Sequence, residues 1–218
     1  MSGLFRLHTV VSPVYEENCY IVARPGRDDC VVFDPGLDPQ SILEVLETEG
    51  LTPAMILNTH GHGDHIAGNA ALKNAYKEAP LVIGRNDEPM LSDPALNLSA
   101  FSGYSVTSPP ADRLLDEGDI LEVAGFQWEV LDIPGHSPGH IVFVQRGPDG
   151  QVAVFGGDVL FRGSIGRTDF PGGDHAGLIR GIRRKLFTLP DATVVYPGHG
   201  PVTTVGREKS TNPFCGLE

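Results

Sequence analysis

The sequence predicts a layered α/β protein that forms a single domain over residues 1–218. Strand-like apolar runs are mixed with helical patterns along the chain, and the strands gather in two halves. The 27 Gly and 18 Pro residues are spread between these segments as turn signals. No stretch is rich enough in them to mark a linker between two domains.

Short runs of β-branched and aromatic residues, bounded by turn-forming residues, predict strands. In chain order they cover residues 20–23, 30–33, 54–57, 81–83, 126–133, 141–145, 152–155 and 193–196. Apolar residues at helical spacing predict helices over residues 38–49, 67–78 and 176–186. In the last of these, one helix face carries Leu178, Ile179, Ile182 and Leu186.

Four of the predicted strands end in the same way, with small or turn-forming residues followed by a His or an Asp. Functional groups in α/β proteins collect in loops just beyond strand ends, where the sheet holds them rigidly. We therefore expect these loops to converge on one site. They are Asn58-Thr59-His60, Pro134-Gly135-His136, Gly156-Gly157-Asp158 and Pro197-Gly198-His199.

The segment THGHGDH is the strongest local signal in the chain. His60 and His62 can point to the same side of an extended turn and reach one ion. Asp64 and His65 follow as the chain bends into a helix, and they can face a second position. Imidazole and carboxylate groups together suit Zn, Fe or Mn, so the pattern predicts a metal site. We expect His140 at most to support a neighbouring loop or to donate a hydrogen bond near the site.

Charge and cysteine content limit the partners that the chain can have. The formal net charge of −12 repels phosphate backbones, so we do not expect nucleic acid as a partner. The N-terminal residues show no secretion signal, and no apolar run approaches the roughly 18 residues of a membrane span. The 3 cysteines have no metal-ligand spacing and fit a reducing compartment. We therefore expect a cytoplasmic protein with no membrane partner.

The order and spacing of the His and Asp residues resemble the metallo-β-lactamase superfamily. Three stretches, THGHGDHIAG, PGHSPGHIVF and GDVLFRGSIGRTDFPGGD, are similar to glyoxalase II (hydroxyacylglutathione hydrolase), in particular to its short bacterial relatives. The resemblance implies a four-layer αββα metallo-β-lactamase sandwich with the metal site at one edge between two sheets. It also implies a division of ligands, in which one metal is held by His60, His62 and His136, the other by Asp64, His65 and His199, and Asp158 bridges them.

Two departures from glyoxalase II concern the binding of glutathione. The chain ends about 19 residues after His199, so most of the helical C-terminal domain that helps the long enzymes to hold glutathione is expected to be absent. The family has a Lys and a Tyr after the bridging Asp and a Tyr just beyond the last His, where this chain has the loop Gly166-Arg167-Thr168-Asp169 and Pro201. Arg167 could still hold a substrate carboxylate through a bidentate contact.

The resemblance implies a metal-dependent hydrolase that cleaves a small-molecule thioester. The expected substrate is S-2-hydroxyacylglutathione, such as S-lactoylglutathione, and the products are the 2-hydroxy acid and glutathione. Two divalent metal ions, zinc first and iron or manganese as alternatives, would lower the pKa of a shared water, and the metal-bound hydroxide would attack the acyl carbon. We expect the catalytic residues to be His60, His62, Asp64 and Asp158.

Two alternatives stay open. The loop GRTDF over residues 166–170 is similar to that of the persulfide dioxygenases, which share this scaffold, and two His with one carboxylate suit a single non-haem iron. Metal stoichiometry and oxygen uptake would separate that activity from hydrolysis. The other alternative is a non-catalytic metal-binding protein on the same fold, although no ligand position is missing here.

Overall fold

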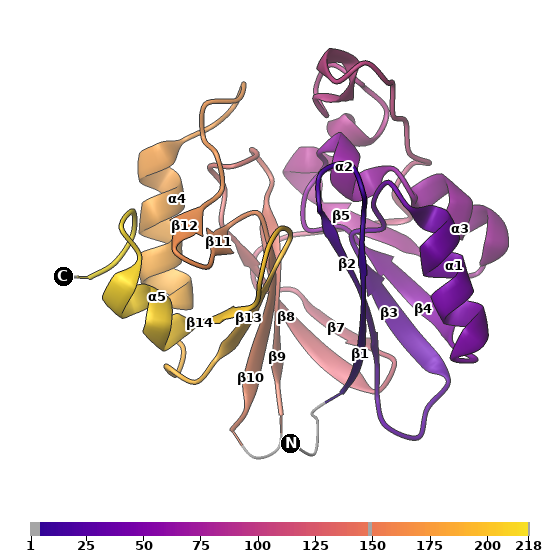
Figure 1. The fold of residues 1–218 in the computed structure, drawn as a ribbon, viewed down its shortest axis with the longest axis horizontal. Helices are drawn as coiled ribbons and strands as arrows, with labels where there is room; N and C mark the ends of the chain where they lie inside the picture. Colours follow the sequence, from indigo (N-terminus) through magenta and orange to yellow (C-terminus); the bar gives the residue numbers. More distant parts are fainter. Residues whose placement is uncertain (1–4, 148–149, 218) are drawn as a thin grey trace.

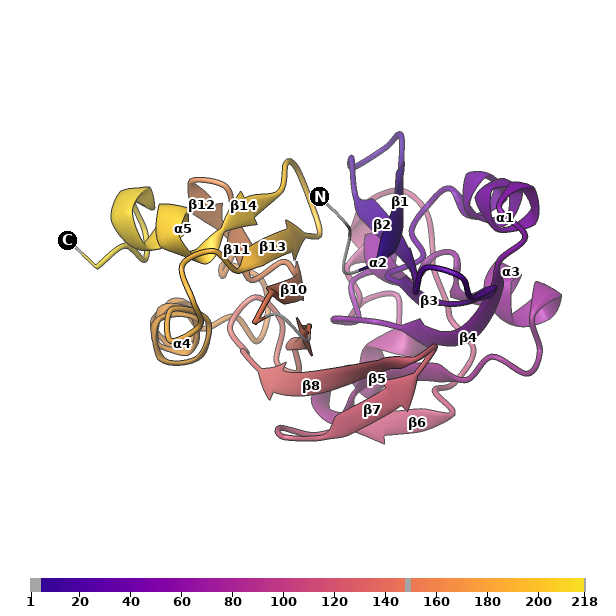
Figure 2. The ribbon, with the colours of Figure 1, turned by 90° about the horizontal axis from the view of Figure 1, so that it is seen from below.

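The computed structural model describes residues 5–147 and 150–217, so residues 1–4, 148–149 and 218 of the predicted domain lie outside it. Two sheets of six strands pack face to face, and helices cover their outer faces (Figures 1 and 2). This is the four-layer αββα arrangement that the resemblance to the metallo-β-lactamase superfamily implies. None of the described helices has the length and apolar character that a membrane crossing needs.

The first sheet is built from the N-terminal half of the chain. In space and in sequence its order is β1 (Arg6–Val11), β2 (Asn18–Ala23), β3 (Asp29–Phe33), β4 (Thr52–Leu57), β5 (Leu81–Gly84) and β6 (Arg113–Leu115). Strands β3 to β6 are parallel, so their carboxyl ends meet at one edge. The other elements of this half are α1 (Pro39–Thr48), α2 (Gly63–Ile66), α3 (Asn69–Ala75), η1 (Arg85–Leu91) and η2 (Ser99–Phe101).

The second sheet comes from the C-terminal half, with the spatial order β14-β13-β10-β9-β8-β7. Strand β9 is antiparallel to both of its neighbours, while β10 and β13 are parallel, so β8, β10 and β13 all end at the same edge. The strands are β7 (Ile120–Val123), β8 (Phe126–Asp132), β9 (Ile141–Arg146), β10 (Val152–Gly157), β13 (Val194–Pro197) and β14 (Thr203–Thr204). The remaining elements are β11 (Leu160–Phe161), β12 (Ser164–Ile165), α4 (His175–Gly181), η3 (Ile182–Leu186) and α5 (Val205–Thr211).

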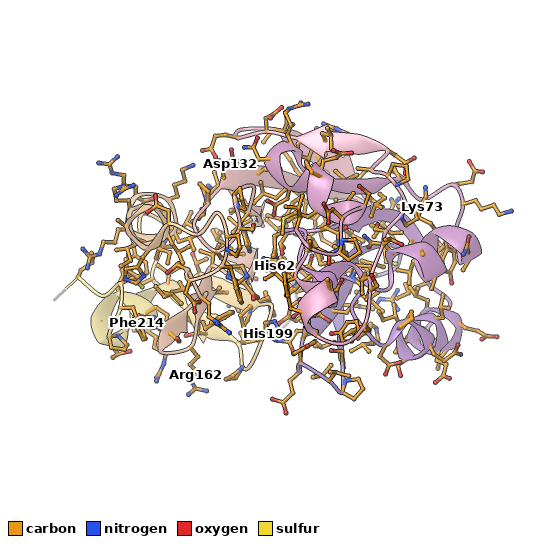
Figure 3. The ribbon with its side chains drawn as sticks, turned by 90° about the horizontal axis from the view of Figure 1, so that it is seen from above. His62, Lys73, Asp132, Arg162, His199 and Phe214 are labelled. Atoms are coloured by element: carbon orange, nitrogen blue, oxygen red, sulfur yellow. The ribbon has the colours of Figure 1, made fainter. Side chains whose placement is uncertain are left out.

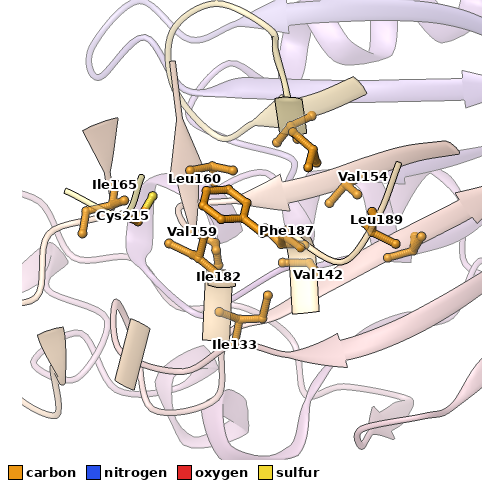
Figure 4. Packing of buried hydrophobic residues seen from close by; sticks show 14 of the residues in the cluster. Ile133, Val142, Val154, Val159, Leu160, Ile165, Ile182, Phe187, Leu189 and Cys215 are labelled. Atoms are coloured by element: carbon orange, nitrogen blue, oxygen red, sulfur yellow. The ribbon is translucent and has the colours of Figure 1, made fainter. Parts of the chain in front are cut away.

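Apolar side chains fill the space between the layers. Trp128 is fully buried between the sheets, and its ring lies edge-on to Phe33 at a centroid distance of 5.1 Å. A second cluster joins the other face of the second sheet to α4 and η3, where Ile133, Val142 and Ile182 are buried (Figure 4). Burial of such area is the main force that holds the layers together.

The structure contains elements that the sequence pattern does not predict, among them β1, β6, β7 and α5. Strand β1 reads RLHTVV and is only partly buried, so it lacks the continuous apolar run of its neighbour β2. Helix α5 is short, and most of its residues are polar. The predicted helix over residues 67–78 is shorter in the structure, where it is α3, and Gly68 separates it from α2. A Cβ at Gly68 would lie 2.9 Å from the carbonyl oxygens of Pro35 and Gly36.

Candidate metal centre

The loops that follow β4, β8, β10 and β13 converge at one edge of the sandwich, as the sequence predicts. The first of these loops comes from the first sheet and the other three from the second, so the cluster spans the junction between the two halves. His62 and His199 mark this position, where the two halves meet (Figure 3). All seven sequence-predicted ligand side chains lie in this cluster.

One group in the cluster consists of His60, His62 and His136, whose ligand atoms lie within 4.8 Å of one another. His62 Nδ1 is 2.9 Å from His136 Nε2. His136 Nδ1 lies 2.8 Å from the backbone carbonyl oxygen of Arg167. A carbonyl can only accept, so Nδ1 carries the proton and Nε2 presents its lone pair to the cluster.

A second group consists of Asp64, His65 and His199, which are also within 4.8 Å of one another. Helix α2 begins at Gly63, so the turn that carries His60 and His62 leads directly into the helix that carries Asp64 and His65. His199 Nε2 is 3.4 Å from Asp64 Oδ2 and 3.3 Å from His65 Nε2.

The carboxylate of Asp158 faces both groups. Its Oδ2 lies 3.4 Å from His136 Nε2 and 3.5 Å from His199 Nε2, while its Oδ1 lies 3.5 Å from His65 Nε2. Gly157 precedes it with a φ of +46°, in the left-handed region that favours glycine. This conformation ends β10 and turns the Asp158 side chain into the cluster.

The donor set fits divalent cations. Burial, together with the neighbouring His65, lowers the pKa of His60 well below its ordinary value. Burial acts to raise the pKa of Asp64, but nearby His65 and His199 outweigh it and hold that pKa below its ordinary value. A neutral imidazole and an ionised carboxylate are the forms that bind metal. Among the described residues, His60 Nε2 and Asp158 Oδ1 are buried without a hydrogen-bond partner, as expected of atoms that face a cation.

Asp34 forms hydrogen bonds with Thr59, the residue before His60. Its carboxylate accepts hydrogen bonds from the backbone N–H and the hydroxyl of Thr59, both at 2.7 Å, and its Oδ2 lies 3.2 Å from His65 Nδ1. The same Thr59 hydroxyl is 3.0 Å from His60 Nδ1. A carboxylate behind a histidine fixes the ring orientation and leaves the other nitrogen free to bind a cation.

The N-terminal segment fixes the His199 loop. The side-chain amide of Asn18 donates to the backbone carbonyls of Pro197 and Gly200, at 3.0 and 2.9 Å. His199 Nδ1 donates to the backbone carbonyl of Tyr15 at 2.9 Å, so its Nε2 is the free nitrogen. Residues nearly 180 positions apart in the sequence therefore meet at this corner of the cluster.

His140 supports the cluster as a hydrogen-bond acceptor and not, as expected, as a donor. It is fully buried, and its Nε2 accepts a hydrogen bond from the backbone N–H of Asp158 at 3.0 Å. Its ring also stacks on His60 at a centroid distance of 4.7 Å. The contact therefore positions the Asp158 loop.

A cavity of about 650 Å³ opens over the cluster, and much of its wall is aromatic. Phe170 lies 5.5 Å from the His62 ring and Phe161 lies 6.2 Å from the His199 ring, measured between centroids. Arg167 lies at the edge of the cavity, with its guanidinium 4.4 Å above the Phe170 ring. It donates to both oxygens of Asp169, at 3.0 and 2.9 Å, so its charge already has a partner.

Sequence reasoning missed Asp34 as a functional residue, although a signal for it exists. Asp34 follows the apolar strand β3 and precedes Pro35 and Gly36, so it obeys the strand-end rule that identifies the other loops. Its φ of +45° is uncommon for a residue other than glycine.

Comparison with known proteins agrees with this geometry. The family model described as "Metallo-beta-lactamase superfamily" matches residues 13–199. A probable metallo-hydrolase, YqgX of Bacillus subtilis, is 40% identical over 205 residues, which are 94% of this chain and 94% of that protein. The hydroxyacylglutathione hydrolase GloC of Haemophilus influenzae is 36% identical over 201 residues, which are 92% of this chain and 93% of that protein.

Solved structures show the same relationship. The B3 metallo-β-lactamase BLEG-1 superposes with a TM-score of 0.89 at 38% identity, covering 96% of this chain and 99% of that one. TTHA1623 in a di-iron-bound form has a TM-score of 0.80 at 41% identity, covering 95% and 99%. ETHE1 from Myxococcus xanthus has a TM-score of 0.77 at 29% identity, covering 98% and 86%. With its sandwich fold and its His and Asp cluster, the chain belongs to the metallo-β-lactamase superfamily.

Proposed function

We propose that the chain is a two-metal thioesterase that hydrolyses S-2-hydroxyacylglutathione, such as S-lactoylglutathione, to the 2-hydroxy acid and glutathione. The observation that carries the proposal is the cluster of seven side chains at the base of a cavity, arranged as two groups that share the carboxylate of Asp158. The likeness to the hydroxyacylglutathione hydrolase GloC over more than nine-tenths of both chains supports the same substrate class.

In this proposal the three-imidazole group, His60, His62 and His136, would hold one cation. The group with a carboxylate, Asp64, His65 and His199, would hold the other, and Asp158 would serve as a ligand of both groups. Zinc suits these ligands, as do iron and manganese, and the likeness to a protein solved with two irons supports a pair of metals. When bound, the metals would supply Lewis acidity toward the acyl oxygen and would make water acidic enough to react near neutral pH.

The residues of the chain would bind and orient the substrate. Phe170 and Phe161 flank the cluster and exclude water from the two sides of the thioester. Arg167 is the one cation among the described residues that line the cavity, and we propose that it holds a substrate carboxylate by exchanging part of its contact with Asp169. The thiolate is a good leaving group, so the reaction needs no strong general acid.

We propose catalytic roles for His60, His62, Asp64 and Asp158, because all four belong to the ligand cluster and the last three also line the cavity. Outside the cluster, the described residues that line the cavity include few ionisable groups, namely Tyr15, Tyr104 and Arg167. Burial, with the neighbouring Tyr15, raises the pKa of Tyr104, so its phenol stays protonated. The Tyr104 phenol can therefore donate a hydrogen bond but cannot serve as the base.

The proposal is tested by measuring metal content and hydrolysis of S-lactoylglutathione on one preparation. Two metals per chain together with release of free glutathione are the expected result. Two metals without hydrolysis of this or of other acyl glutathiones would reject the substrate class. Loss of activity on treatment with a chelator, and its return with Zn²⁺, would connect the two measurements.

A persulfide dioxygenase is the second candidate, because the loop with Arg167 and Phe170 lies at the cavity edge and ETHE1 from Myxococcus xanthus is a structural relative. That activity predicts one iron per chain, oxygen consumption with glutathione persulfide and no thioester hydrolysis. A non-catalytic metal-binding protein predicts bound metal with neither activity.

A further inference from the structure

Asp87 lies outside the cluster, yet it joins two of the loops that form it. It is fully buried in η1, and its carboxylate accepts three hydrogen bonds. Oδ2 accepts from the backbone N–H of Gly61 at 3.1 Å and from the hydroxyl of Ser137 at 2.6 Å. Oδ1 accepts from the backbone N–H of Gly139 at 2.6 Å. Gly61 lies between His60 and His62, and Ser137 follows His136, so one side chain connects the two loops of the three-imidazole group.

The backbone around Asp87 is packed tightly against both loops. A Cβ at Gly61 would lie 2.5 Å from Met90 Cβ, and a Cβ at Gly139 would lie 2.8 Å from Asp87 Oδ1. Glycine at these two positions lets η1 approach closely enough for the three hydrogen bonds to form. The loops therefore have little freedom to move relative to each other while the Asp87 carboxylate is in place.

The other group in the cluster is supported by residues other than Asp87. Asp34 lies behind His65, and the Tyr15 carbonyl accepts from His199. No hydrogen bond of Asp87 reaches helix α2, which carries Asp64 and His65, or the loop that carries His199. Asp34 therefore supports both groups, through Thr59 beside His60 and through His65, whereas the Asp87 carboxylate contacts only the two loops of the three-imidazole group.

We propose that Asp87 is a positioning residue that fixes the His60–His62 turn against the His136 loop and so sets the cation affinity of the three-imidazole group alone. The inference rests on the proposed function, because it assumes that both groups bind a cation. Asn cannot replace Asp here, since its amide nitrogen would face at least one of the three donors.

The test uses Asp87→Asn, with Asp112→Asn as the matched control. Asp112 also accepts a backbone N–H, that of Leu81 at 2.8 Å, but it makes no hydrogen bond to a cluster loop. The metal-free protein is titrated with ¹¹³Cd²⁺ and observed by cadmium NMR, whose chemical shift separates a three-nitrogen site from one with a carboxylate. Affinities are measured by calorimetry.

The expected result is about a 10- to 100-fold weaker three-nitrogen site in Asp87→Asn, with the carboxylate-containing site within twofold of wild type and Asp112→Asn unchanged. Ser137→Ala, which removes one of the three hydrogen bonds, should give a smaller loss at the same site. Equal weakening of both sites, or no weakening, would overturn the inference. If Asp87→Asn does not fold, an unchanged three-nitrogen site in Ser137→Ala overturns it instead. A wild-type protein that binds fewer than two Cd²⁺ would reject the proposed two-metal function itself.

Discussion

Phe33 of the first sheet stacks on Phe155 of the second, with ring centroids 4.4 Å apart and planes inclined by 6°. Both side chains are buried, and Phe155 lies on the strand that leads to Asp158. The stack therefore links the packing of the sandwich to the position of the candidate site. It is a direct contact between the two halves of the chain.

Replacing Phe33 by Ala should lower the free energy of unfolding by about 3–5 kcal/mol, because it removes a buried ring and leaves a cavity between the sheets. Urea denaturation followed by circular dichroism measures this loss. Ile120→Ala is the control, since Ile120 is an exposed residue on β7 and should cost about 0.5 kcal/mol or less. Equal losses in the two variants would contradict the role of the stack.

Asp158→Ala should release metal from both groups and abolish turnover, because the Asp158 carboxylate faces His65, His136 and His199 at once. Elemental analysis after dialysis and an assay with S-lactoylglutathione measure the two effects. Asp132→Ala, which changes a carboxylate at the end of β8 outside the cluster, should retain both metals. Two retained metals and normal activity in Asp158→Ala would refute the bridging role.

Arg167→Ala should raise KM about three- to tenfold with little change in kcat, because a remote carboxylate contact contributes to binding and not to the chemical step. Asp169→Ala is the informative partner variant, since it frees the guanidinium from its present ion pair. The KM of the Asp169→Ala variant should fall or stay the same. If KM is unchanged in Arg167→Ala, the residue does not hold the substrate.

His140→Phe should keep the ring stacked on His60 but leave the backbone N–H of Asp158 without its acceptor. An unsatisfied buried donor costs about 1–3 kcal/mol, so the variant should melt at a lower temperature and should also lose metal more readily. His175→Phe changes an exposed histidine and serves as the control. Normal stability and metal retention in His140→Phe would show that another group satisfies the amide.

The sequence predicts the ligand residues of the cluster better than the residues that support their loops. All seven ligand histidines and aspartates either lie in one motif or repeat one strand-end pattern, and such local patterns are visible without a structure. Asp87 has no such pattern, because its three partners lie 26, 50 and 52 positions away in the chain. Support of this kind depends on tertiary contacts that only the folded chain brings together.

The edges of the fold were harder to predict than its centre for a related reason. Strands β2 and β10 are buried on both faces and read as continuous apolar runs. Strand β1 and helix α5 lie at the outside, where one face meets solvent and the apolar pattern fades. The apolar pattern therefore predicts the fully buried strands. It does not predict the peripheral elements, because these form by packing or pairing with a neighbouring element.

The hydrogen bonds from Asn18 to the carbonyls around His199 also have a consequence for synthesis of the chain. An N-terminal fragment emerging from the ribosome already carries the THGHGDH segment, but His199 is made 134 residues after His65, and only then can its loop meet Asn18. Contacts that distant in sequence form late in folding. Under the proposed two-metal function, the complete set of ligands therefore exists only when folding is nearly finished, and uptake of the second metal would report that state.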